Sequence, residues 1–161
     1  MAIALDPEVL IADEPTTALD VTVQAQIMEL LKDLQSQRDM GLILITHDLG
    51  VVADVADKAA VMYAGRIVER SNIHDLYSRP AHPYTEGLLR SIPRVDSKGT
   101  ELDAIPGLPP TLTRLPSGCN FAPRCTYAQP ACNDAYPPVV QITDDHASAC
   151  FRWQEVYDDA E

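Results

Sequence analysis

The chain has 161 residues, of which 46% are apolar and 22% charged, and its formal net charge at pH 7 is −12. This composition is that of a globular protein and excludes a disordered or fibrous chain. Acidic residues exceed basic ones in both halves, so neither half offers a basic surface for nucleic acid or anionic lipid. No apolar run is long enough to span a membrane, and the first ten residues lack a signal peptide's features. We therefore expect a soluble, cytosolic protein.

The first part of the chain predicts two strands joined by a helix. Apolar runs at 9–12 and 42–45 are bounded by residues that break regular structure, which favours buried strands of a parallel sheet. Between them, residues 21–38 contain no Gly or Pro and repeat apolar side chains at helical spacing. Asp20 precedes this stretch and is expected to cap the helix.

The next elements complete an alternating pattern. Asp48 is expected to cap a short helix over 49–56, and residues 59–63 and 66–68 predict a hairpin that turns at Ala64-Gly65. The order of strands and helices predicts an α/β fold with an open, mostly parallel sheet and an antiparallel edge.

Polar residues follow both predicted parallel strands. Asp13 and Glu14 come at the end of the first strand, and Thr46-His47-Asp48 follows the second. Ligands of such sheets bind beyond the carboxyl ends of the strands. These side chains are therefore candidates for a binding or catalytic site.

The predicted sheet is incomplete. Residues 1–70 supply fewer strands than the five or six of an average sheet. Residues 1–5 resemble the end of a helix, and the sequence has no Gly-x-x-x-x-Gly-Lys-Ser/Thr phosphate loop. We therefore expect the chain to be the C-terminal part of a longer protein and to be inactive alone if that protein is a nucleotide enzyme.

Two motifs resemble those of ATP-binding cassette (ABC) ATPases. Residues 9–20, Val-Leu-Ile-Ala-Asp-Glu-Pro-Thr-Thr-Ala-Leu-Asp, resemble the Walker B strand and the D-loop, and Ile45-Thr46-His47-Asp48 resembles the switch-histidine segment. The resemblance covers residues 1–70 and implies part of a P-loop NTPase fold. The family's Walker A, glutamine loop and signature motif would precede Met1.

The resemblance implies a role for each site residue in ATP hydrolysis. Asp13 would bind Mg²⁺, usually through a water, and Glu14 would polarise the attacking water as general base. His47 would contact the γ-phosphate, and Asp20 would face a partner cassette. The plainer alternative is a solvated strand end at Asp13-Glu14 and a helix-capping role for His47.

The second half narrows the family. Residues 78–93 resemble the His-Pro-Tyr segment of oligopeptide/dipeptide importer ATPases, with Pro83 suited to the first turn of a helix. We expect this segment to dock the tail, and we assign no chemistry to His82 or Tyr84. The Pro-Gly-x-Pro-Pro at 106–110 matches the same family. The predicted organisation is an ABC part at 1–70, a docking segment at 71–93, a Pro-rich linker at 94–117 and an irregular cysteine-rich region at 118–161.

All four cysteines lie near the C-terminus, and they are Cys119, Cys125, Cys132 and Cys150. A reducing cytosol disfavours disulfides, and zinc modules usually have more closely spaced cysteine pairs. A [4Fe–4S] cluster tolerates looser spacing, and the importer resemblance favours it over zinc or free thiols. Such a cluster would be structural. His146 is a spare ligand candidate but is expected at the surface.

Two hypotheses follow for function. The first is the energy-coupling ATPase subunit of a peptide importer, peripheral on the cytoplasmic face of the plasma membrane. Its partners would be a second ATPase subunit (a distinct homologue or a second copy), membrane permeases and, indirectly, an extracytoplasmic peptide-binding protein. The solute itself, whether dipeptide, oligopeptide or nickel, is left open. The alternative is a non-catalytic, metal-stapled docking module.

Overall fold

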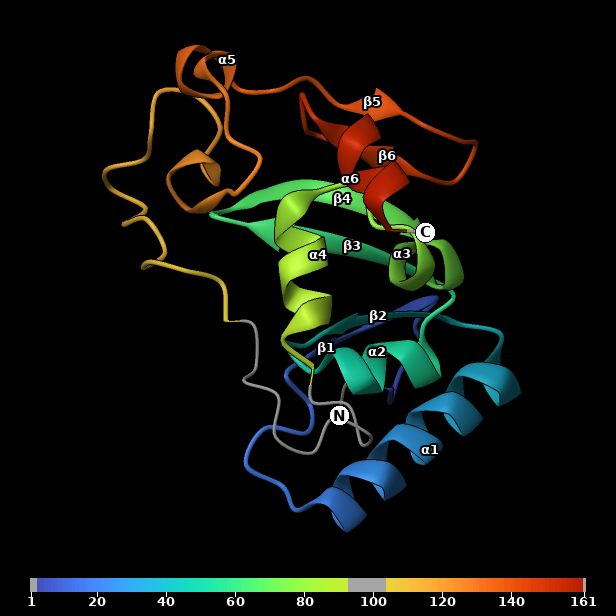
Figure 1. Ribbon diagram of the computed structural model, residues 1–161. Coiled ribbons are helices and arrows are strands. Elements are labelled where there is room, and N and C mark those ends of the chain that lie inside the picture. Colours follow the sequence, from blue (N-terminus) through green and yellow to red (C-terminus); the bar gives the residue numbers. More distant parts are fainter. Residues whose placement is uncertain (1–2, 93–103, 161) are drawn as a thin grey trace, which may run out of the picture. The chain divides into compact units, whose positions relative to one another are not determined.

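The chain divides into two compact units, Met1–Val55 and Ala56–Glu161. The computed structural model describes residues 3–92 and 104–160 (Figure 1). The part of the predicted linker before residue 104 lies outside these ranges, as does the start of the helix end expected at 1–5, whose described part forms a turn. Within the described ranges, no helix is both long and apolar enough to cross a membrane.

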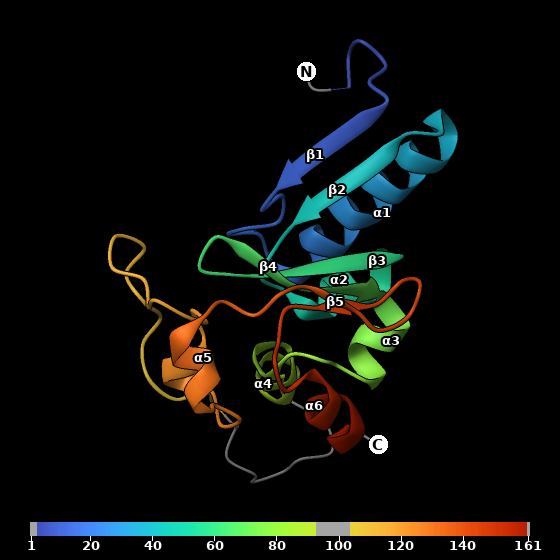
Figure 2. The ribbon, with the colours of Figure 1, turned by 90° about the horizontal axis from the view of Figure 1, so that it is seen from above.

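The first unit is a parallel pair of strands with two helices. Strand β1 pairs with β2 in parallel, and α1 runs alongside them (Figure 2). Leu10 of β1 and Met28 of α1 are buried, because the helix covers one face of the pair. The other face leaves Ile11 and Ile43 at least half exposed. The elements are β1 (Val9–Asp13), α1 (Val21–Arg38), β2 (Gly41–Ile45) and α2 (Leu49–Val55).

Helix α1 confirms the predicted span and its cap. The Asp20 carboxylate accepts hydrogen bonds from the backbone N–H groups of Thr22 and Val23, both at 3.0 Å. These are two of the donors that the first turn of a helix leaves without an intrahelical partner. The helix ends at Arg38, and the backbone of its cap residue Asp39 takes the left-handed conformation (φ 49°).

The second unit contains a four-stranded sheet in the order β3-β4-β6-β5, with antiparallel pairing throughout. Its β3–β4 hairpin confirms the hairpin prediction, with longer strands than expected. The single, mostly parallel sheet is not observed: among the described strands only β1 and β2 are parallel. The sheet of the second unit is antiparallel because β4 pairs with an antiparallel strand on each edge, with β3 on one and with the tail strand β6 on the other. The strands are β3 (Lys58–Tyr63), β4 (Arg66–Asn72), β5 (Val140–Gln141) and β6 (Ala147–Ser148).

Short helices pack on this sheet. Helices α4 and α6 contact each other on one side of it (Figures 1 and 2). Pro83 begins α4, as predicted, and the His82 side chain caps the helix by accepting the Tyr84 N–H at 3.1 Å. The helices are α3 (Ile73–Ser78), α4 (Pro83–Arg90), a 3₁₀ turn (Ala122–Arg124), α5 (Pro130–Asp134) and α6 (Trp153–Asp159).

An aromatic core joins the tail to the hairpin. Tyr63 of the hairpin, Tyr84 of α4 and Phe121 of the cysteine region have ring centroids 4.7–5.4 Å apart. These distances allow favourable tilted and edge-to-face contacts. The cysteine region therefore shares one core with the hairpin and the His-Pro-Tyr segment.

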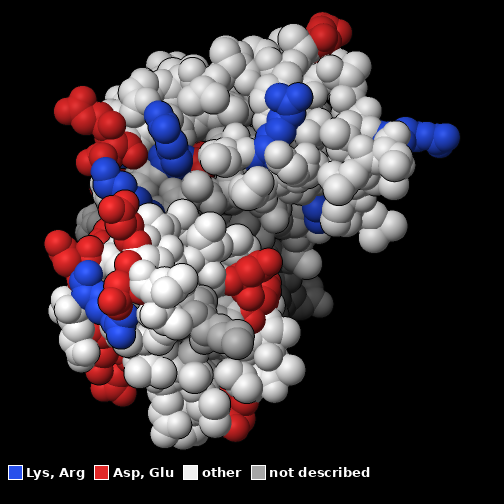
Figure 3. Space-filling model, turned by 180° about the vertical axis from the view of Figure 1, so that it is seen from behind, with Lys and Arg blue, Asp and Glu red and all other residues white. Residues whose placement is uncertain are grey.

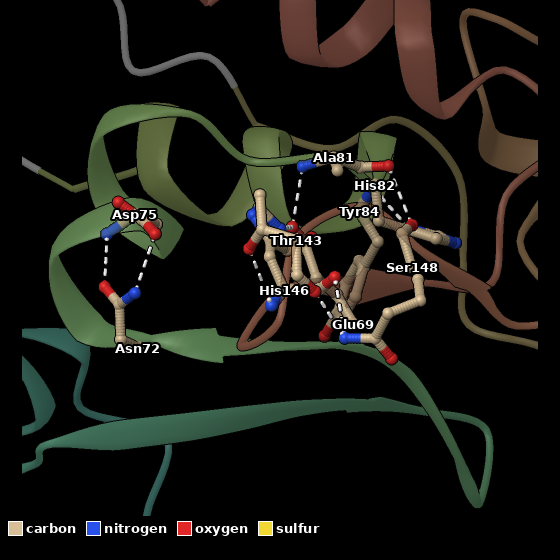
Figure 4. Close-up of polar contacts among 10 residues, drawn as sticks. Glu69, Asn72, Asp75, Ala81, His82, Tyr84, Thr143, His146 and Ser148 are labelled. Carbon is tan, nitrogen blue, oxygen red and sulfur yellow. Dashed lines mark hydrogen bonds and ion pairs between the residues drawn. The ribbon is translucent and has the colours of Figure 1, made fainter.

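A buried polar network reinforces this junction (Figure 4). Glu69 Oε1 lies 2.7 Å from His146 Nε2 and accepts the Ala81 N–H at 2.6 Å. Ser148 Oγ donates to the Ala81 carbonyl at 2.8 Å. The expectation that His146 lies at the surface is wrong, because its ring is completely buried against Glu69.

Candidate functional site

The carboxyl ends of β1 and β2 bring Glu14 and His47 into contact. Glu14 Oε1 lies 2.9 Å from His47 Nδ1, although 33 residues separate them in the chain. The Glu14 N–H donates to the Ile45 carbonyl at 2.8 Å, which extends the parallel pairing by one residue. The contact is open to solvent, with 40% of the Glu14 side chain and 81% of the His47 side chain exposed.

A tight turn orients Glu14. Its backbone takes the left-handed conformation (φ 49°), which is uncommon for a residue with a side chain and often marks functional sites. The Thr17 N–H donates to the Glu14 carbonyl at 3.2 Å, and Thr17 Oγ1 donates to Glu14 Oε2 at 2.5 Å. Each oxygen of the carboxylate therefore has its own partner.

Asp48 anchors the segment that carries His47. One of its oxygens accepts the N–H groups of Gly50 and Val51, which caps α2 as predicted. The other accepts Gln24 Nε2 from α1 at 3.1 Å. The Gln24 hydrogen bond is the main reason why the pKa of Asp48 is lowered. The residue next to His47 is thus tied to two helices.

The contact shifts both titrating groups toward their charged forms. The hydrogen bonds from His47 and then Thr17 lower the pKa of Glu14. The hydrogen bond to Glu14 and its negative charge raise the pKa of His47. A carboxylate base beside an imidazole can orient a water molecule and contact a phosphate oxygen.

The other two predicted site residues are Asp13, at the end of β1, and Asp20, in the segment that follows this strand. Asp13 is exposed as the last residue of β1, in register with Ile45. Asp20 is engaged as the α1 cap, and its predicted role toward a partner cassette stays a prediction. The roles of Asp13, Glu14 and His47 in catalysis likewise stay predictions.

The four cysteines line one cavity in the second unit. The cavity is small, about 10 Å³, and His82 and Phe121 also line it. The Cys119 N–H donates to the Cys132 carbonyl at 2.8 Å. A Cβ on Gly118 would lie 2.2 Å from that carbonyl oxygen, so only glycine fits there. This close approach brings two of the four cysteines together.

The cysteine cavity has suitable donors but not the spacing of a metal site. All four side chains are free thiols, and burial raises the pKa of Cys125 to about 11 and that of Cys150 to about 12. The Arg152 N–H donates to Cys150 Sγ at 3.3 Å. Over residues 3–92 and 104–160, no three or more His, Cys, Asp or Glu side chains are grouped so as to hold a metal ion. The described geometry therefore does not support the predicted iron–sulfur cluster or zinc ion.

The surface carries mixed charge. On the face drawn in Figure 3, Lys and Arg side chains lie in separate places among acidic ones and do not form one continuous basic area. This agrees with the net charge of −12 and gives no support to nucleic-acid binding.

Comparison with known proteins places these residues in a family context. Residues 68–132 match the family described as "Oligopeptide/dipeptide transporter, C-terminal region". The chain is 54% identical over 152 residues to the oligopeptide transport ATP-binding protein OppD of Salmonella typhimurium, covering 94% of this chain and 45% of OppD. The chain is a homologue of peptide-import ATP-binding proteins. It is also 53% identical over 151 residues to the dipeptide transport ATP-binding protein DppD of Bacillus subtilis, covering 94% of this chain and 45% of DppD.

A third peptide-import ATP-binding protein matches nearly the whole chain. The peptide import ATP-binding protein of Brucella ovis is 52% identical over 162 residues, which is 97% of this chain and 48% of the relative. The chain thus spans about half the length of the curated relatives it matches.

Two sets of contacts in this chain were not predicted from the sequence. The hydrogen bond from the Thr17 hydroxyl to Glu14 depends on the left-handed backbone of Glu14. The sequence does not indicate this conformation, because the residue that adopts it is not a glycine. The Glu69–His146 pair joins residues 77 apart. The sequence around Glu69 does not indicate a buried partner, because His146 lies next to a strand of only two residues.

Proposed function

We propose that the chain supplies part of the ATP-hydrolysing, energy-coupling subunit of a peptide importer. The observation that carries the proposal is the 2.9 Å contact between Glu14 and His47 at the ends of two parallel strands. The relatedness to peptide-import ATP-binding proteins supports the choice of ATP as substrate and of peptides as the solute class.

The proposed chemistry assigns one task to each side chain. Glu14 accepts the proton of the attacking water, and His47 uses the ring nitrogen not bonded to Glu14 to contact the γ-phosphate. Asp13 is the oxygen ligand for Mg²⁺, which neutralises phosphate charge when bound. Asp20 keeps α1 in place and faces the partner cassette.

The chain alone is proposed to be inactive toward ATP. Its sequence has no glycine-rich phosphate loop, which supplies the backbone N–H groups that cradle a triphosphate. The relatives are about twice as long, so the remaining half of such a protein would supply that loop.

The partners are proposed from the resemblance to importer ATPases. A complete subunit would pair with a second ATPase subunit and dock on membrane permeases at the cytoplasmic face. An extracytoplasmic peptide-binding protein would deliver the solute. Hydrolysis would open and close the pair of cassettes.

A chimera tests this proposal. In it, the present chain replaces the matching half of Salmonella typhimurium OppD, in a strain that lacks OppD. We expect the chimera to hydrolyse ATP and to restore oligopeptide uptake. A chimera that folds and binds ATP, but neither hydrolyses it nor supports uptake where unaltered OppD does, would contradict the proposal.

A second candidate function is a docking module without chemistry. It is favoured by the compactness of Ala56–Glu161, whose aromatic core and buried polar network involve neither Glu14 nor His47. The chimera separates the two: a docking module would restore assembly with the permeases without ATP turnover.

We further propose that the cysteine region takes up a [4Fe–4S] cluster, with zinc as the alternative. The support is that all four thiols line one cavity and that the Arg152 N–H faces a sulfur, as amides do around iron–sulfur centres. Metal binding would require the cysteines to move closer together.

Metal analysis of the chain prepared without oxygen tests this. We expect about four iron and four sulfide per chain, lost in Cys132→Ser and retained in the control His74→Asn, whose side chain is exposed. Stoichiometric zinc without iron would overturn the cluster, and a chain without either metal would overturn both.

A further inference from the structure

We propose that Thr17 is a positioning residue that fixes the Glu14 carboxylate so that one oxygen faces His47. This inference rests on the proposed function, because it concerns the same catalytic pair. Thr17 itself contacts neither water nor nucleotide in the proposed chemistry, and it acts only through Glu14.

The first support is the division of the carboxylate. Oε2 accepts the Thr17 hydroxyl at 2.5 Å, while Oε1 meets His47 Nδ1 at 2.9 Å. A carboxylate held at one oxygen alone can rotate about its terminal torsion, which is broad and roughly two-fold. Two partners on different oxygens hold one orientation.

The second support is the backbone of the turn. Glu14 keeps a left-handed conformation, which is unfavourable for a residue with a side chain. The Thr17 N–H bond to the Glu14 carbonyl at 3.2 Å helps to hold it. Thr17 thus fixes both the main chain and the side chain of the same glutamate.

The third support is that packing does not explain the position of Thr17. Its side chain is exposed and is not part of the described core. An exposed threonine gains little stability from one hydrogen bond to an exposed carboxylate. The remaining role for this hydrogen bond is to orient the Glu14 carboxylate.

The arrangement also has a chemical cost. A hydrogen bond donated to a carboxylate stabilises its charged form and weakens it as a base. The Thr17 hydroxyl therefore lowers the basicity of the Glu14 carboxylate while it fixes the orientation of that carboxylate. Since misplacing a catalytic group by about 1 Å can cost about 100-fold in rate, direction outweighs basicity here.

Two substitutions in the chimera test the inference. Thr17→Val keeps the shape and removes the donor, and we expect kcat for ATP to fall about 10-fold or more while KM changes by less than about two-fold. Thr17→Ser keeps the hydroxyl and should retain kcat within about three-fold. A merely structural threonine would not give this split between kcat and KM together with rescue by serine.

Comparison with Glu14→Gln distinguishes failure of the positioning role of Thr17 from failure of the proposed function. If Glu14→Gln abolishes turnover and Thr17→Val leaves kcat unchanged, or if serine fails to rescue, the positioning role is wrong and the proposed base stands. If Glu14→Gln leaves turnover unchanged, the proposed function fails. If both substitutions lower kcat and adding Thr17→Val to Glu14→Gln lowers it no further, both are supported.

Discussion

Replacing Glu14 with glutamine in the chimera should reduce ATP turnover by at least about 100-fold while leaving ATP affinity within a few-fold of the original. General bases contribute about 10²- to 10⁴-fold to rate, and glutamine preserves the size of the side chain but cannot take a proton from water. Steady-state phosphate release and equilibrium binding of ATP measure the two quantities separately.

Glu8→Gln is the matched control for this substitution. Glu8 is an exposed acid in the same unit, and its backbone carbonyl, not its side chain, pairs with Gly41. We expect unchanged turnover in the control. Equal turnover in Glu14→Gln and Glu8→Gln would remove Glu14 from the chemistry and leave its contact with His47 without a catalytic role.

Replacing Glu69 with alanine should destabilise the second unit more than any surface change. It leaves the His146 Nε2 and the Ala81 N–H buried without their partner. Leaving a buried hydrogen-bonding group without its partner costs about 1–3 kcal/mol, and about 3 kcal/mol corresponds to a melting temperature lower by roughly 10–20 °C in a unit of this size. Thermal unfolding of the 161-residue chain, followed by circular dichroism, measures the shift.

Two companion variants keep this prediction decisive if Glu69→Ala does not fold. Ser148→Ala removes the bond to the Ala81 carbonyl and should cost about 1 kcal/mol. Lys58→Gln breaks an exposed pair with Asp145 and should cost less than that. A melting temperature that falls as much in Lys58→Gln as in the buried-network variants would refute the network's importance.

The first unit was predictable from sequence because its signals are local. The helix at Val21–Arg38 has no internal Gly or Pro, and the carboxylate of the preceding Asp20 accepts hydrogen bonds from its first turn. The meeting of Glu14 and His47 follows from one geometric rule, since parallel strands present their carboxyl ends at one edge. The rule needed only the two strands and their direction.

The second unit was less predictable because its pairing is distant. Strand β6 has two residues and joins β4 through Glu69 and Ser148, which lie 79 residues apart. Neither hydrophobic periodicity nor turn residues mark such a strand. The same pairing explains why the hairpin joins an antiparallel sheet and why His146 is buried rather than exposed.

A double-mutant cycle on Glu14 and His47 tests the central claim, that these two side chains act as one catalytic unit. In the chimera, we expect Glu14→Gln and His47→Ala each to abolish most ATP turnover, and the double variant to lose no more than the more severe single variant, because residues that act together are strongly non-additive. Losses that multiply in the double variant would show that the two residues act independently and would contradict the account.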